Sequence, residues 1–133
     1  MILVVDASAA VEYLLQTAIG HRVGELLDRA DVAAPELMDA EVLAVLRREV
    51  MARRLESRRA AEAVDDLRAW NAERIAHRGL LAGAWSLRGH VSAYVALYVA
   101  AARARDAALV TADGPLARAP GLEVVVHNVR ASG

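Results

Sequence analysis

The stretch HVSAYVALYVAAARARDAALVTAD, residues 90–113, decides the fold of this chain. After Ser92, which can cap a helix, a nearly apolar run predicts a buried helix from 93 to about 105. The segment AALVTAD at 107–113 then predicts a strand that ends at Asp113. A helix that leads directly into a buried strand is the repeating unit of parallel α/β sheets.

The rest of the chain repeats this alternation. The segment ILVVD at 2–6 is a continuous apolar, β-branched run, as in strands buried within parallel sheets. The remaining patterns predict a helix after Ser8, a helix at about 19–30, a strand at 32–35, a helix from Pro35 to about 54, a helix capped by Ser57 to about 76, a short helix at 80–89, a helical piece after Asp113 and a strand at 122–127. We therefore expect one α/β domain over 1–133, with a mostly parallel sheet and helices on both faces.

Composition excludes several kinds of chemistry. The chain has 133 residues, 56% of them apolar and 25% charged, which is typical of a globular domain with a hydrophobic core. A net charge of −1 creates no overall attraction to nucleic acid or membranes. The lack of cysteine and lysine rules out thiolate chemistry, Cys-based zinc sites, a P-loop and Schiff-base catalysis. The N-terminal apolar run is too short for a signal peptide or a membrane span, so we expect a cytoplasmic protein.

Three acidic residues stand out by their positions. Asp6 and Asp113 each follow the carboxyl end of a predicted strand, where parallel sheets bind their ligands. Glu41 lies on the apolar stripe of its helix, whereas Asp39 points nearly the opposite way, as a solvated surface acid would. Structural roles remain open for each: Asp6 as a helix cap, Asp113 as a turn residue, and Glu41 as the ion-pair partner of Arg48.

A cluster of the three acids would favour metal binding. Carboxylates at close range raise each other's pKa unless a cation neutralises them. Hard oxygen ligands without His or Cys are typical of Mg²⁺ or Mn²⁺ sites. Such a site suits the attack of metal-activated water on a phosphodiester.

Four segments, in their order and spacing, match the pattern of a known family. They are VVDASAAVEYLL at 4–15, APELMDAEVLAVLRR at 34–48, VSAYVALYVAAA at 91–102 and LVTADGPLAR at 109–118. This pattern resembles PIN domains, and within them the VapC-type toxins of bacterial toxin–antitoxin pairs, over nearly the whole chain. The resemblance implies a three-layer PIN-like fold and a Mg²⁺- or Mn²⁺-dependent endoribonuclease that cuts tRNA, rRNA or mRNA. It also implies a homodimer and inhibition by a cognate antitoxin.

The resemblance assigns roles to individual residues. It places catalytic, metal-binding acids at Asp6, Glu41 and Asp113, and Thr111 and Ser92 support the site. The family has a further metal-binding Asp in the pattern TAYDALYVA.

Val95 stands at that position in this chain. Because valine cannot coordinate a cation, we expect weak metal binding and slow or absent cleavage. Two origins are open, a deliberate change that disarms a toxic enzyme or a natural, degenerate member. The intact sequence around Val95 favours a single recent change.

Arginines cluster along the middle helices and have two interpretations. They can form a solvated face paired with nearby glutamates, or they can contact RNA phosphates or an acidic antitoxin segment. The arginines that we assign to such contacts are Arg47, Arg48, Arg53 and Arg54.

Other functions compete with a ribonuclease. A catalytically inactive PIN-fold module that binds antitoxin or RNA is the alternative, although such a module should also have lost Asp6, Glu41 or Asp113. A phospho-acceptor α/β domain would need a lysine near the phosphate, and this chain has none. The helix at 93–102 is nearly all apolar and needs burial on every side, so we expect a dimer.

Overall fold

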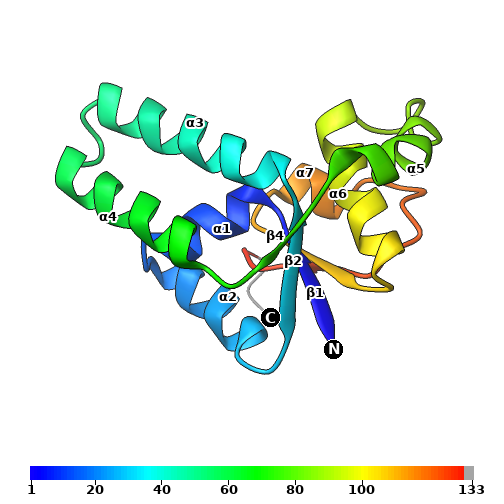
Figure 1. The fold of residues 1–133 in the computed structure, drawn as a ribbon, viewed down its shortest axis with the longest axis horizontal. Coiled ribbons are helices and arrows are strands. Elements are labelled where there is room, and N and C mark those ends of the chain that lie inside the picture. The colour runs from blue at the N-terminus through cyan, green and yellow to red at the C-terminus, as the bar shows by residue number, and fades with distance from the viewer. Residues whose placement is uncertain (131–133) are drawn as a thin grey trace.

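Parallel strands form the centre of the fold, and helices cover both faces of the sheet (Figure 1). The computed structural model describes residues 1–130. The strands in this range are β1 (Ile2–Val5), β2 (Asp31–Pro35), β3 (Glu73–Ile75), β4 (Ala108–Thr111) and β5 (Val126–Asn128). Every pair of neighbouring strands there is parallel, so the predicted α/β class is confirmed. The predicted domain over 1–133 extends to 131–133, which lie outside the described residues.

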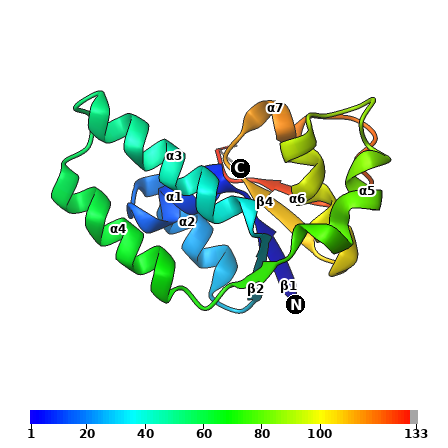
Figure 2. The same cartoon turned by 45° about the horizontal axis from the view of Figure 1, so that its top comes forward.

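The helices form two groups, one on each side of the sheet, and the turned view in Figure 2 shows the same division. One group contains α1 (Ala7–Leu14), α2 (Ala18–Leu27), α3 (Leu37–Met51) and α4 (Ser57–Ala69). The other contains the 3₁₀ helix η1 (His77–Leu80), α5 (Leu81–Trp85), α6 (Ala93–Ala104) and α7 (Gly114–Ala117). None of the helices within residues 1–130 combines the length and apolar character that crossing a membrane requires.

The strand order determines where a ligand site can form. The order is β3-β2-β1-β4-β5, so the chain moves outward from β1 to β3 and then returns to the opposite side of β1 with β4. The switch point therefore lies between β1 and β4, and open parallel sheets bind ligands at such a point, outside the carboxyl ends of the strands. Val5 pairs with Val110 in this register, which brings the next residues, Asp6 and Thr111, side by side.

Apolar residues of these two strands form the centre of the core. Val4, Val5, Leu109 and Val110 have no exposed surface, as expected for strands covered by helices on both faces. The rigid centre of the sheet thus carries the strand ends from which the site is built.

Helix caps were predicted with mixed success. Ser92 caps α6 as predicted, since its hydroxyl accepts a hydrogen bond from the Val95 N–H. Ser8 does not cap α1: the carboxylate of Asp6 does, accepting from the Ala9 N–H at 3.0 Å. Ser57 is the first residue of α4 and not its cap. A serine near the start of a helix gives the same sequence signal whether it is the cap or one of the first residues of the helix.

Two strand boundaries also differ from the prediction. Pro35 ends β2 and pairs with Ile75, where its fixed φ suits extended backbone, and α3 begins two residues later. The helix predicted to about residue 76 ends at Ala69, and Glu73–Ile75 form β3 instead. This edge strand has only three residues, two of them charged, so it lacks the apolar pattern of a buried strand. The last strand begins at Val126, not at 122.

Arg74 fastens β3 to the helices beside it. Its guanidinium donates to both carboxylate oxygens of Asp39 at 3.1–3.2 Å. It also donates to the backbone carbonyls of Leu67, Trp70 and Ala72 at 2.7–2.8 Å. Asp39 lies at the surface as predicted, with its side chain 40% exposed. Its ion pair with Arg74 was not predicted, because the pattern of one helix does not reveal a cation on a distant strand.

Close contact between α1 and α2 depends on Gly20. A Cβ atom at Gly20 would lie 1.9 Å from the backbone oxygen of Glu12, whereas one at Gly24 would lie 3.6 Å from the Tyr13 ring. We expect Gly20→Ala to lower the free energy of unfolding by about 3 kcal/mol, since backbone must move. The matched control Gly24→Ala should raise it by up to about 1 kcal/mol through helix propensity. Urea unfolding measures both, and equal effects would contradict this packing.

Candidate active site

Asp6 lies at the switch point and is held by one hydroxyl group from α1 and one from β4. Its side chain is 4% exposed. One carboxylate oxygen accepts from the Ser8 hydroxyl at 2.7 Å and from the Ala9 N–H, and the other accepts from the Thr111 hydroxyl. The backbone N–H of Asp6 donates to the Val110 carbonyl at 3.1 Å and extends the ladder between β1 and β4. Three donors thus fix the carboxylate in one orientation, and the ladder contact fixes the backbone that carries it.

The same hydroxyls join Asp6 to the end of β4. The Ala112 N–H donates to the Ser8 hydroxyl oxygen at 2.9 Å, and the Asp113 N–H donates to the Thr111 hydroxyl oxygen at 2.9 Å. Ser8 was predicted only as a cap, so sequence reasoning missed its contact with the site. Its position two residues after a strand-end acid, at the start of the following helix, was the available signal.

Burial changes the acidity of Asp6. Loss of hydration raises the pKa of the Asp6 carboxyl above its ordinary value. Hydrogen bonds from Thr111, Ser8 and Ala9 partly offset the rise, and the negative charge of Asp113 adds to it. The Asp6 carboxyl is thus destabilised in its charged form, which a bound cation would favour.

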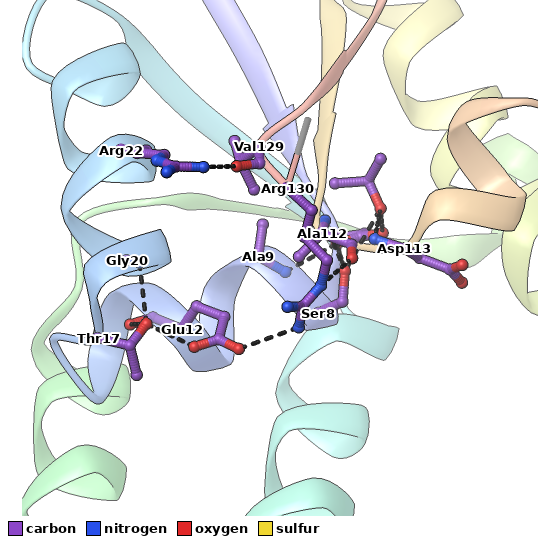
Figure 3. Close-up of polar contacts among 12 residues, drawn as sticks. Ser8, Ala9, Glu12, Thr17, Gly20, Arg22, Ala112, Asp113, Val129 and Arg130 are labelled. Atoms are coloured by element: carbon purple, nitrogen blue, oxygen red, sulfur yellow. Dashed lines mark hydrogen bonds and ion pairs between the residues drawn. The ribbon is translucent and has the colours of Figure 1, made fainter. Parts of the chain in front are cut away.

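Asp113 differs from Asp6 in its exposure. It is exposed and caps α7, with one carboxylate oxygen accepting from the Leu116 N–H at 3.4 Å. Figure 3 shows its carboxylate directed away from Ser8 and Ala112. Asp113 therefore has a structural role, as a helix cap and not as the turn residue of the alternative, and the same side chain also borders the cleft described below.

The C-terminal segment braces this end of the sheet. Arg130 donates to the Ala112 carbonyl at 2.7 Å and to the Glu12 carboxylate at 3.2 Å (Figure 3). The contacts connect the loop after β4 to α1. They help to hold Asp113 in a fixed position relative to Asp6.

Glu41 reaches the site from α3 and is held by Tyr98 of α6. The Tyr98 hydroxyl donates to one Glu41 carboxylate oxygen at 2.7 Å. Burial raises the pKa of this hydroxyl well above its ordinary value, and the hydrogen bond to Glu41 adds to the rise, so Tyr98 stays a proton donor. The alternative ion pair with Arg48 is not found within residues 1–130, where Arg48 lies 4.0 Å from Glu49. Sequence reasoning missed Tyr98, because its apolar helix gave no sign of a polar partner.

These side chains line one cleft of about 300 Å³. Asp6, Glu41 and Asp113 border it, and so does Val95, which is half-buried. The structure thus brings the three predicted acids together, with Val95 beside them. A larger cavity of about 640 Å³ lies between α1, α2 and α4, but no residue that ends β1 or β4 lines it.

The oxygen ligands of the cleft are of the type that hard divalent cations prefer, but the set of ligands is incomplete. Its charged oxygens come from carboxylates, which Mg²⁺ and Mn²⁺ prefer. Asp6 and Asp113 are close enough for one charge to affect the pKa of the other carboxyl. Within residues 1–130, however, no three His, Cys, Asp or Glu side chains are gathered closely enough to hold a metal ion as they stand. An apolar side chain at Val95 is consistent with that shortfall.

The arginines assigned to contacts occupy different surroundings. Arg48 lines the cleft, and Arg47 lines a separate groove between α3 and α4. Arg54 is exposed and forms an ion pair with Glu49 at 2.6 Å, and Arg53 is exposed in the turn after α3. Their contacts with RNA or an antitoxin stay predictions.

Comparisons with known proteins agree with the fold and with the family that the sequence resembles. A family model described as PIN domain matches residues 3–122, which include every acid of the cleft. Ribonuclease VapC1 of Mycobacterium tuberculosis is 40% identical over 129 residues, which cover 96% of this chain and 97% of that protein.

Solved structures are similar in fold. One similar chain comes from the crystal structure of VapBC2 of Rickettsia felis bound to a DNA fragment from the promoter. The two chains superpose with a TM-score of 0.71 at 17% sequence identity, and the match covers 96% of this chain and 98% of that one. VapC20 of Mycobacterium tuberculosis, described as a sarcin–ricin loop cleaving toxin, has a TM-score of 0.63 at 20% identity, with coverages of 92% and 98%. Identities this low show a shared fold alone.

Proposed function

This chain belongs to the PIN-domain family, among the VapC-type ribonuclease toxins, and we propose that it is an endoribonuclease that depends on Mg²⁺ or Mn²⁺. The observation that carries the proposal is the meeting of Asp6, Glu41 and Asp113 in one cleft at the switch point. The R. felis relative is named as a VapBC complex, which supports a cognate antitoxin as the inhibitor of this protein.

Each side chain has a role in this proposal. Asp6 and Asp113 would hold the cation from the ends of β1 and β4, and Glu41 would contribute a third carboxylate from α3. The cation, when bound, supplies positive charge that stabilises the charge developing on a phosphodiester and makes water a better nucleophile. Thr111 holds the Asp6 carboxylate in place, and Tyr98 does the same for Glu41. These fixed orientations reduce the reorganisation that binding would otherwise require.

Val95 reduces the activity that this site can reach. It faces the cleft from the first turn of α6, where the Ser92 hydroxyl already accepts from its backbone N–H at 3.3 Å. The valine side chain offers no oxygen to a cation. The same observation favours a second candidate function, a PIN-fold module that binds antitoxin or RNA without cleaving it.

The assembly and location of the protein stay predictions. We expect a homodimer, which light scattering at micromolar concentration would test, and a monomer mass would count against it. We also expect a single domain over 1–133 and a cytoplasmic location, where RNA and antitoxin are available.

The proposed activity is tested by prolonged incubation with total RNA and with single-stranded oligoribonucleotides. We expect slow cleavage in Mn²⁺ or Mg²⁺ that a chelator stops and that Asp6→Asn abolishes. Cleavage that persists in chelator would indicate a contaminating, metal-independent nuclease. No cleavage of any RNA, either by this chain or by its Val95→Asp variant, would favour the binding module.

A further inference from the structure

Tyr94 is an aromatic side chain that the core does not use. It is 61% exposed, although it lies in α6, where Ala96, Tyr98 and Val99 are buried. Its side chain borders the same cleft as the acids. The ring gains no burial in this position and is accessible to a ligand that enters the cleft.

The wall of the cleft beside Tyr94 is apolar. Val95, Val45 and Leu116 line it together with Tyr94, so the cleft has acids on one part of its surface and hydrocarbon on another. A carboxylate at position 95 would place negative charge next to the tyrosine ring, whereas valine does not. Apolar and aromatic surface beside charged groups suits the flat face of a nucleobase, which is attached to a charged backbone.

Arg48 supplies positive charge at the same cleft, from α3. It follows Glu41 by seven residues, or two helical turns, and therefore lies on the same side of α3. Its side chain is 65% exposed, and its contact with Glu49 is only a long one of 4.0 Å. The guanidinium is thus available to a phosphate, which arginine binds with two parallel hydrogen bonds.

We propose that Tyr94 is a stacking platform for one unpaired nucleobase of single-stranded RNA, and that Arg48 binds a phosphate of the same strand. The inference rests on the proposed function and assigns two residues of the cleft to recognition of its substrate. A base within a duplex is covered on both faces by its neighbours, so it cannot stack on a protein ring. The chain should therefore select single-stranded segments or loops over helical RNA, and Tyr94 should contribute to that selection.

Binding to a fluorescent single-stranded oligoribonucleotide, measured by anisotropy in the presence of chelator, separates recognition from cleavage. We expect Tyr94→Ala to weaken binding by about tenfold, within the range that base–aromatic stacking contributes. Tyr94→Phe should bind like the parent chain, because it keeps the ring. The matched control is Trp85→Ala, which removes an exposed ring on α5 that does not line the cleft. Thermal unfolding of each variant verifies that its fold is intact.

Arg48 is tested by the salt dependence of the same binding. Arg48→Ala removes one phosphate contact. It should therefore reduce the slope of the logarithm of affinity against the logarithm of salt concentration by about 0.7 for a single strand. Arg58→Ala is the control, since Arg58 is exposed on α4 and does not line the cleft. A duplex of the same sequence should bind more weakly than the single strand and should be insensitive to Tyr94→Ala.

The outcomes separate this inference from the proposed function. If the chain binds or cleaves RNA but Tyr94→Ala and Tyr94→Phe leave affinity unchanged, the stacking platform is wrong and the ribonuclease proposal stands. Equal losses from Tyr94→Ala and Trp85→Ala would also overturn the platform, because they would indicate a general surface effect. Absence of RNA binding in the parent chain would overturn the platform and count against the ribonuclease as well.

Discussion

The Val95→Asp variant is expected to cleave RNA about 10- to 100-fold faster than the chain with valine, in Mg²⁺ or Mn²⁺ and not in chelator. Even outer partners of metal ligands contribute factors of this size, so a direct ligand should contribute at least as much. Val95 lines the cleft with Asp6, Glu41 and Asp113, and an acid there would add the oxygen ligand that the set lacks. Initial rates on total RNA and on a labelled oligoribonucleotide measure the gain.

The fold should tolerate this change. Position 95 lies in the first turn of α6, where the helix dipole stabilises an anion, and its side chain is only half-buried. In the control Val95→Asn, the asparagine side chain has nearly the same shape as aspartate but no charge. This variant should gain little activity. Expression of Val95→Asp without an antitoxin should also slow growth of the host. Equal, chelator-sensitive rates for all three proteins would show that position 95 is dispensable.

Asp6→Asn, made in the Val95→Asp background, is expected to abolish at least 99% of that cleavage, a loss of about 100-fold or more. Asparagine caps helices as well as aspartate does, so α1 should keep its cap while the site loses a negative charge. Asp6→Ala should lose the cap as well, at a cost of about 1 kcal/mol of unfolding free energy. Asp65→Asn changes an exposed acid of α4 outside the cleft and should leave cleavage unchanged. Retention of activity by Asp6→Asn would remove Asp6 from the chemistry.

The pH dependence of stability provides a second measure of Asp6. Burial raises its pKa, so in chelator the folded state holds this proton more tightly than the unfolded chain does. The resulting stability is fully present below about pH 4, the ordinary pKa of aspartate, and is lost as pH rises through the higher folded-state pKa. Asparagine does not titrate, so Asp6→Asn should remove this part of the pH dependence. Urea unfolding across this pH range measures the difference.

The sequence predicts the buried elements better than the peripheral ones. The apolar run of β1 and the capped, apolar helix α6 have strong patterns, and both occur near the predicted residues. The β3 strand was missed because it is a short edge strand whose stability comes from pairing with β2 and from the contacts of Arg74. Those partners are distant in sequence, so no local pattern contains them.

The site shows the same limit. Asp6, Glu41 and Asp113 could be identified because a strand end or an apolar stripe is a marked position for an acid. Tyr98 could not, because its role depends on Glu41, which is 57 residues away and belongs to another helix. Local sequence thus indicates which acids converge, and only the tertiary fold indicates which groups orient them.

Mn²⁺ binding, measured by isothermal titration calorimetry without RNA, tests the central claim most directly, because it does not require the RNA target to be known. Four proteins are compared: the parent chain, Val95→Asp, Asp6→Asn and the double variant. We predict that Val95→Asp strengthens binding by about 10- to 100-fold and that Asp6→Asn removes the gain, because both side chains would contact one cation. Mn²⁺ affinities that are the same in all four proteins would contradict a metal site in this cleft.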